Sequence, residues 1–243
     1  MAAFPFSSFR RTQAIFEVRF DEAYLVWDRS GVVWRNVGRN FKNLKSQSAS
    51  PNQVTFMGDD RFVMAVTLDR ASITDHRPQG GIDGTIEPLA MFVRTVIEDL
   101  DVTVLTRVGN RYLYSIECKS LEEARRKAQA AVPLAVPKKK LFSIDPARIA
   151  PSFKIEGDDG ELGYIAQIYP REQRIGFSPP PDAAAVGLEK VENISSELMF
   201  DIDFFTKKPL PVSGFDAKSW LQAWHKTITR EADVFFALAE GHQ

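Results

Sequence analysis

Three arginines with the chemistry to bind an anion, and one glutamate beside them, occur in two segments whose composition favours β-strand. Glu17 and Arg19 lie in AIFEVRF, and Arg107 and Arg111 lie in LTRVGNRYLYSI. Side chains alternate between the two faces of a strand, so each pair projects from one face. Guanidinium groups suit phosphate and carboxylate because they donate paired hydrogen bonds. If both strands share a sheet, the four residues are predicted to line a groove for an anionic small molecule; the alternative is cross-strand ion pairing.

A second pair of charges, Asp201 and Asp203, has the same spacing in MFDIDFF. Two carboxylates on one face of a strand can bind Mg²⁺, or one of them can have a raised pKa. The alternative is the solvent-facing side of an outer strand. These two residues are the candidates that the sequence offers for a metal site, and no cofactor is predicted.

Histidine and cysteine are scarce in this sequence. His76, His225 and His242 have no second metal ligand at a spacing such as HExxH, and the motif GxSxG does not occur. Cys118 is the single cysteine, which excludes an internal disulfide and a thiolate zinc cluster. No catalytic set is assembled from these residues, so the sequence favours a protein that is not an enzyme.

The composition is that of an ordinary soluble protein, with 243 residues, 44% of them hydrophobic, and a net charge of −1. The basic loop 35–45 and Lys138–Lys140 could attract nucleic acid, but the near-zero net charge argues against that partner. No apolar run approaches the ~18 residues of a transmembrane helix, and no signal peptide is recognised. A cytoplasmic protein without membrane contact is predicted.

A central strand at 102–118 must position the two later arginines. This stretch, VTVLTRVGNRYLYSIEC, contains four Val or Ile residues, two Thr and two Tyr, which favour a half-buried sheet surface. Read with period two, its arginines share one face and its tyrosines the other. Gly109 is predicted to form a β-bulge, and the alternative is a hairpin that turns at Gly109–Asn110.

The remaining elements follow from the periodicity of apolar residues. Further strands are expected at 14–20, 54–57, 62–68, 71–74, 153–156, 163–169, 174–177 and 197–205. Amphipathic helices are expected at 86–100, 120–131 and 217–239. The segment 24–34 is predicted to form two short apolar pieces around a turn at Asp28–Gly31, and 35–53 an exposed loop.

These elements define an α+β fold of two lobes, each an antiparallel sheet with packed amphipathic helices. The lobes span 1–132 and 141–243. The segment PLAVPKKK at 133–140 is predicted to link them, because its prolines restrict the backbone and its lysines keep it solvated. The long C-terminal helix carries an apolar stripe with Trp220 and Trp224, which is expected to pack on a sheet or, as the alternative, on another subunit.

The segments AIFEVRF, LTRVGNRYLYSI, MFDIDFF and WLQAWHKTITREADVFF follow one another along the chain. Together they resemble a sporadically distributed, uncharacterised prokaryotic protein family, whose members carry an EVRF-like N-terminal strand, an R-x-G-x-R-Y strand, an LDID-like strand and a closing H-x-x-I-x-x-x-F helix. The sequence departs from that pattern at Asn110, where leucine is common, and at Tyr114, where asparagine is common. The resemblance implies no particular activity, but a patchy distribution is typical of accessory and defence-associated genes.

The sequence therefore predicts an accessory binding or interaction protein without a catalytic set, with a protein partner or as a homo-oligomer. The alternative is an enzyme or sensor for a phosphorylated small molecule that uses Glu17, Arg19, Arg107 and Arg111. The two differ in a structural property, because the alternative requires those side chains to converge on a concave surface.

Overall fold

The structure, a computed structural model, describes residues 5–50, 52–79, 81–131, 149–177 and 191–239. The predicted linker 133–140, with Lys138–Lys140, lies outside these ranges, and so does His242.

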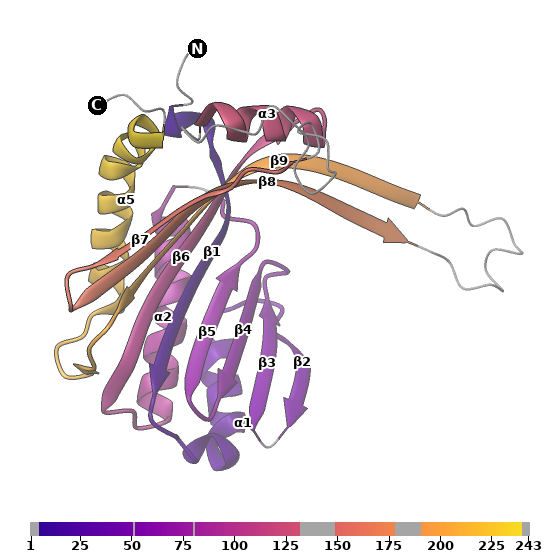
Figure 1. The fold of residues 1–243 in the computed structure, drawn as a ribbon. Helices are drawn as coiled ribbons and strands as arrows, with labels where there is room; N and C mark the ends of the chain where they lie inside the picture. Colours follow the sequence, from indigo (N-terminus) through magenta and orange to yellow (C-terminus); the bar gives the residue numbers. More distant parts are fainter. Residues whose placement is uncertain (1–4, 51, 80, 132–148, 178–190, 240–243) are drawn as a thin grey trace, which may run out of the picture.

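Ten strands of the described chain form one antiparallel sheet in the order β2-β3-β4-β5-β1-β6-β9-β8-β7, with β10 beside β6 (Figure 1). They are β1 (Arg10–Phe20), β2 (Lys45–Ser50), β3 (Gln53–Gly58), β4 (Phe62–Thr67), β5 (Arg70–Asp75), β6 (Val104–Cys118), β7 (Phe153–Asp158), β8 (Leu162–Phe177), β9 (Val191–Thr206) and β10 (Leu210–Pro211). β6 pairs with β1 along one edge and with β9 along the other. Strands from both predicted lobes therefore belong to a single sheet, and β6 joins them.

Helices cover one face of this sheet (Figure 1). They are η1 (Phe6–Ser8), α1 (Leu25–Gly38), α2 (Asp83–Asp99), α3 (Leu121–Ala131) and α5 (Ala217–Ala239). α2 packs on β1 and β5 and also contacts α1 and α5, whereas α3 packs on β8 and β9. The predicted α+β class, the antiparallel pairing and the long C-terminal helix are confirmed. Among these described helices, none combines the length and the hydrophobicity that crossing a membrane requires.

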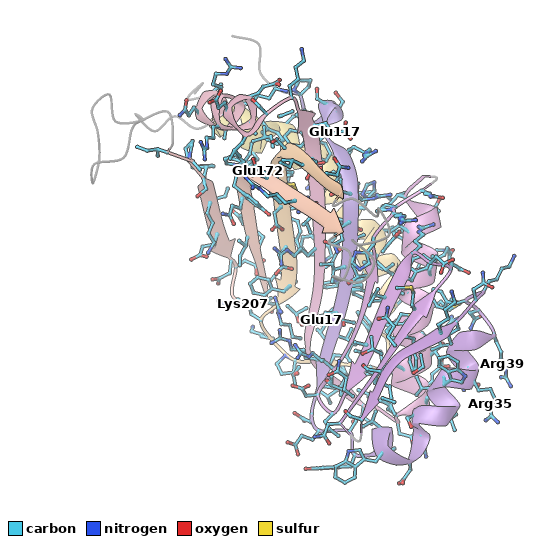
Figure 2. All side chains as sticks on the ribbon, turned by 90° about the vertical axis from the view of Figure 1, so that its right-hand side faces the viewer. Glu17, Arg35, Arg39, Glu117, Glu172 and Lys207 are labelled. Carbon is cyan, nitrogen blue, oxygen red and sulfur yellow. The ribbon has the colours of Figure 1, made fainter. Side chains whose placement is uncertain are left out.

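The first of these helices corrects the prediction for 24–34 and part of that for 35–53. α1 is continuous from Leu25 to Gly38, so the turn predicted at Asp28–Gly31 is wrong. Its buried residues Val26, Val33 and Val37 share one side, while Gly31 lies on the exposed side with no neighbour near it. β2 follows as a fully exposed edge strand without apolar alternation. Arg35 and Arg39 of the predicted basic loop project from α1 into solvent (Figure 2).

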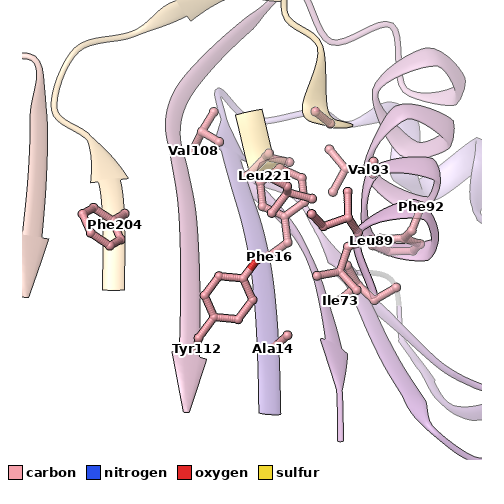
Figure 3. Close-up of a cluster of buried hydrophobic side chains, with 14 of the residues drawn as sticks. Ala14, Phe16, Ile73, Leu89, Phe92, Val93, Val108, Tyr112, Phe204 and Leu221 are labelled. Carbon is pink, nitrogen blue, oxygen red and sulfur yellow. The ribbon is translucent and has the colours of Figure 1, made fainter. Parts of the chain in front are cut away.

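The core lies between the helices and the sheet. Along β1, Ala14, Phe16 and Val18 are fully buried, and the residues between them are partly exposed. Phe16 faces α2, where Leu89 and Val93 are also fully buried (Figure 3). This strict alternation is what made the strand recognisable in the sequence.

The register of β6 passes unbroken through Gly109, between β1 and β9. Both predictions for this residue, a bulge and a hairpin turn, are therefore wrong. A Cβ at Gly109 would lie 3.7 Å from the guanidinium carbon of Arg107, which is an ordinary contact distance, so the space beside Arg107 would also admit an alanine. The irregularity lies instead at Thr106, an extra residue relative to β1, which returns Leu105 to the buried face.

The last helix begins and packs as the sequence predicted. The Asp216 carboxylate caps it by accepting hydrogen bonds from the backbone N–H groups of Lys218 at 3.3 Å and Ser219 at 3.1 Å. Trp224 stacks on Phe204 of β9 with ring centroids 4.4 Å apart. The apolar stripe of α5 thus packs on the sheet of the same chain.

We expect Trp224→Ala to lower the free energy of unfolding by about 3 kcal/mol, because it removes a ring that is stacked on the sheet. Val234, which is 57% exposed on the same helix, is the matched control, and its alanine variant should change stability by less than about 0.5 kcal/mol. Urea unfolding of both variants tests the expectation. A Trp224 variant that unfolds like the wild type would contradict the packing of α5 on β9.

Candidate functional site

The four charged residues singled out in the sequence lie on the open face, defined as the face of the sheet opposite the helices. β1 and β6 are neighbours, and their register places Arg19 opposite Arg107 and Glu17 opposite Gly109. Arg111 lies two residues further along the same face of β6. The structure therefore brings the four side chains to one surface.

Ion pairs connect these residues within β1 and across the neighbouring strands. We use the name charge ladder for the set Glu17, Arg19, Arg107, Arg111, Asp201 and Asp203. Nε of Arg19 donates to Glu17 at 2.8 Å, and Nη1 of Arg107 lies 3.6 Å from the same carboxylate. Nη2 of Arg107 also donates to Asp203 of β9 at 3.3 Å. The guanidinium carbon of Arg107 lies 4.5 Å from the ring centre of Phe205, a cation–π contact.

Asp201 of β9 forms the ion pair with Arg111 in the charge ladder. It is buried and accepts two hydrogen bonds from Arg111, the one from Nε at 2.8 Å. That interaction raises the pKa of Arg111, and burial raises the pKa of Asp203 against the opposing effect of Arg107. Each aspartate faces an arginine, and within the described residues no group of three or more His, Cys, Asp and Glu is placed to hold a metal ion.

The charge ladder matches the alternative that the sequence offered for these residues, which was ion pairing across the strands instead of a groove for an anion. Arg107 and Arg111 already donate to the carboxylates of β9, and Arg19 to that of β1. An incoming anion would have to displace a carboxylate from each of them. The ladder therefore contributes more to the alignment of β1, β6 and β9 than to holding a ligand.

A polar cavity of about 570 Å³ opens beside the ladder, and we call it the arginine pocket. Its lining comes from the start of β1, the loop after β5, Leu113 of β6, and the parts of β8 and β9 near the point where they bend away as a two-stranded ribbon (Figure 1). Its polar lining consists of Arg10, Arg11, Thr12, Gln13, His76, Arg77, Gln79, Arg171, Gln173 and Glu197. Among the described residues, four arginines and one carboxylate therefore line the cavity.

Hydrogen bonds fix one wall of the arginine pocket. Glu197 is buried and accepts a hydrogen bond from the Ser115 hydroxyl at 3.0 Å. The other oxygen of Glu197 accepts from Nε of Arg171 at 3.2 Å and from a second nitrogen of the same guanidinium. Arg171 is thus held in place at the edge of the cavity while part of its side chain stays exposed.

The opposite wall, the loop after β5, is anchored by Asp75. This fully buried carboxylate accepts hydrogen bonds from Nε of Arg61 at 2.8 Å, from the Thr85 hydroxyl at 3.2 Å and from the backbone N–H of Arg77 at 3.0 Å. The backbone at Arg77 is therefore fixed, whereas its side chain is exposed and forms no ion pair with any carboxylate in the described ranges. Arg77 is consequently the pocket cation with the greatest freedom to meet a ligand.

Arg11 links the pocket to polar groups in the core. It donates to the Thr85 hydroxyl at 3.3 Å, and its guanidinium carbon lies 5.9 Å from the ring centre of Tyr112. The hydroxyls of Tyr112 and Tyr114 are buried without a hydrogen-bond partner among the described residues. Burial raises the pKa of Tyr112 to about 12, and burial together with Arg11 lowers the pKa of His225.

Sequence reasoning did not single out the arginine pocket. Arg10, Arg77 and Arg171 come from segments that are far apart in the chain, and none of those segments contains a binding motif. The available signal was the arginine content of the N-terminal segment and of the loop RPQGG, which becomes meaningful only when the sheet order is known.

Comparison with known proteins adds no assignment, because no protein-family model matches the chain and no curated protein matches it significantly. The fold and the site define an α+β protein built on a single antiparallel sheet, with a cationic pocket at one end. Its resemblance to the prokaryotic family stays a prediction.

The buried tyrosine predicts a loss of stability at alkaline pH. An unfolded tyrosine ionises near pH ~10, whereas Tyr112 in the fold keeps its proton to about pH 12. Above pH ~10 the unfolded chain loses a proton that the folded chain keeps, so the free energy of unfolding falls as pH rises. From Tyr112 alone the loss should reach about 1.4 kcal/mol at pH ~11. Urea unfolding between neutral pH and that value should show a smaller loss for Tyr112→Phe; equal losses in both proteins would contradict the assignment.

Proposed function

We propose that this protein is a cytoplasmic binding protein that holds an anionic ligand, one with phosphate or carboxylate groups, in the arginine pocket. The observation that carries the proposal is the four-to-one ratio of arginines to carboxylates around the cavity. The whole chain has a net charge of −1, so this local excess of positive charge is not a consequence of a basic composition.

The pocket residues supply suitable donors for such a ligand. Arg171 is oriented by Glu197, and a fixed guanidinium loses less conformational entropy when it binds an anion. Arg77 and Arg10 add exposed guanidinium groups, that of Arg10 lying 3.8 Å from Glu117, and Gln13 and Gln173 add neutral amide donors. A cavity of about 570 Å³ also falls within the usual size range for small-molecule sites, about 300–1,000 Å³.

The proposal assigns binding rather than turnover to this pocket. It retains the anionic ligand of the alternative sequence interpretation, an enzyme or sensor for a phosphorylated small molecule, and moves it to other residues. The predicted groove of Glu17, Arg19, Arg107 and Arg111 receives less support, because each of its arginines is paired with a carboxylate. In the pocket, Arg10 and Arg171 are also paired, but Arg77 has no ion pair within the described ranges.

Isothermal titration calorimetry with pyrophosphate, tripolyphosphate and nucleoside triphosphates tests the proposal. We expect at least one of these anions to bind, and Arg77→Gln and Arg171→Gln each to weaken it about tenfold, the loss of one charge-assisted hydrogen-bonding group. At a ligand concentration about 100 times Kd, binding should also stabilise the fold by about 2.7 kcal/mol.

Arg39→Gln is the matched control, because Arg39 is exposed immediately after α1 and does not line the pocket. It removes the same charge and should leave the affinity unchanged. Equal affinities for the wild type, Arg77→Gln and Arg171→Gln, or the absence of binding by every anion tested, would contradict the proposal.

A further inference from the structure

An exposed aromatic pair lies at the opposite end of β1 from the arginine pocket. Tyr24 is 54% exposed and Trp27 is 53% exposed, and their ring centroids are 5.2 Å apart in an edge-to-face arrangement. Both lie at the start of α1 on the side away from its buried valines. Val104, 39% exposed at the start of β6, lies across the same cavity.

These residues line a groove of about 440 Å³, which we call the aromatic groove. It lies between the segment that joins β1 to α1 and the segment that joins α2 to β6. Its charged lining consists of Asp21, Glu22, Asp28 and Asp101, and neither lysine nor arginine lines it in the part of the chain that the structure describes. The groove thus combines exposed aromatic rings with carboxylates.

Part of this negative charge is free to meet a partner. Asp101 is paired with Arg29 at 2.7 Å, and Glu22 accepts a hydrogen bond from the Tyr24 hydroxyl. Asp21 and Asp28 are exposed and form no ion pair within the described ranges.

We propose that the aromatic groove binds a basic segment of a partner protein, with a lysine or arginine side chain against the rings of Trp27 and Tyr24. A basic segment is favoured because its positive charge is complementary to the carboxylates that line the groove. The aromatic rings attract a cation through their faces, and the surrounding carboxylates add long-range attraction. Exposed tryptophan and tyrosine are also the residue types that most often dominate the energy of protein interfaces.

This inference is independent of the proposed ligand in the arginine pocket. The two sites have opposite charge, and they use different residues at the two ends of β1. The protein would therefore hold a small anion at one end and a basic protein segment at the other.

Fluorescence anisotropy with labelled octalysine and octaarginine peptides tests the inference on the full chain. We expect the wild type to bind a peptide, and Trp27→Ala and Tyr24→Ala each to weaken binding about tenfold, since a desolvated cation–π contact contributes that much. Asp28→Asn should weaken binding and reduce its salt dependence. Both aromatic side chains are half exposed, so these variants should fold, as circular dichroism can verify.

Glu117→Gln is the matched charge control, because Glu117 has a side chain that is 81% exposed, lies outside the groove, and has its ion-pair partner, Arg10 at 3.8 Å, at the other end of β1. It should bind the peptides as the wild type does. The inference would be overturned by equal binding of the wild type and Trp27→Ala, or by an equal loss in Asp28→Asn and Glu117→Gln, which would indicate a general charge effect. A dimer that Trp27→Ala dissociates, without peptide binding, would assign the groove to a second copy and would also overturn it.

Discussion

The whole structure depends on one constraint on β6. This strand is hydrogen-bonded along both edges, and its two faces lie in different environments, one in the apolar core and one on the open face. Its helix face carries Val108 and Tyr112, which are fully buried in the core. Its open face carries Arg107 and Arg111, which donate to carboxylates of β9. A shift of register by one residue would place the arginines in the core and the apolar residues in solvent. The core and the charge ladder therefore select the same register, and that register joins the strands of the two halves of the chain.

The same register sets the positions of the two proposed sites. β1 is bound to β6 along most of its length, with Arg10 at its start and Phe20 at its end. Ten residue steps in a strand span about 33 Å, so the arginine pocket and the aromatic groove are held apart by roughly that distance. α2 packs on β1 and β5 on the helix-covered face of the sheet. Because β1 is paired with β5 and β6, its two ends can carry two sites of opposite charge, and neither site has to be part of the core.

Several elements could be predicted because the spacing of their apolar residues indicates which side chains are buried. β1 and β9 alternate, with Phe16 and Phe200 on the buried side, and α5 carries its tryptophans and phenylalanines at helical spacing. α1 was missed because Gly31 and the valines around it favour a turn between short strands when they are read locally. Its helical state depends on Val26 and Val33 packing into a core formed by distant segments. Tertiary packing overrides local propensity there.

The candidate sites depended still more on structure. Strand alternation was enough to predict that Glu17 and Arg19 share a face, and likewise Asp201 and Asp203. It could not predict that the aspartates would lie opposite the arginines, because the pairing of β6 with β9 involves residues about 90 positions apart. The arginine pocket draws its residues from still more separate segments, so no local spacing could indicate it. The sequence places Trp27 in a short apolar piece without indicating that its side chain is exposed, because exposure cannot be deduced from residue type.

The central claim, that β6 joins both halves of the chain into one sheet, can be tested by native-state hydrogen exchange with mass spectrometry at rising urea concentrations. If the claim is correct, the amides of β1, β6 and β9 are the most protected, and all three exchange through the same global opening reaction, with the same free energy and the same dependence on urea. If the amides of β9 and α5 instead exchange at lower urea concentrations than those of β1 and β6, the two halves unfold separately, and the claim is contradicted.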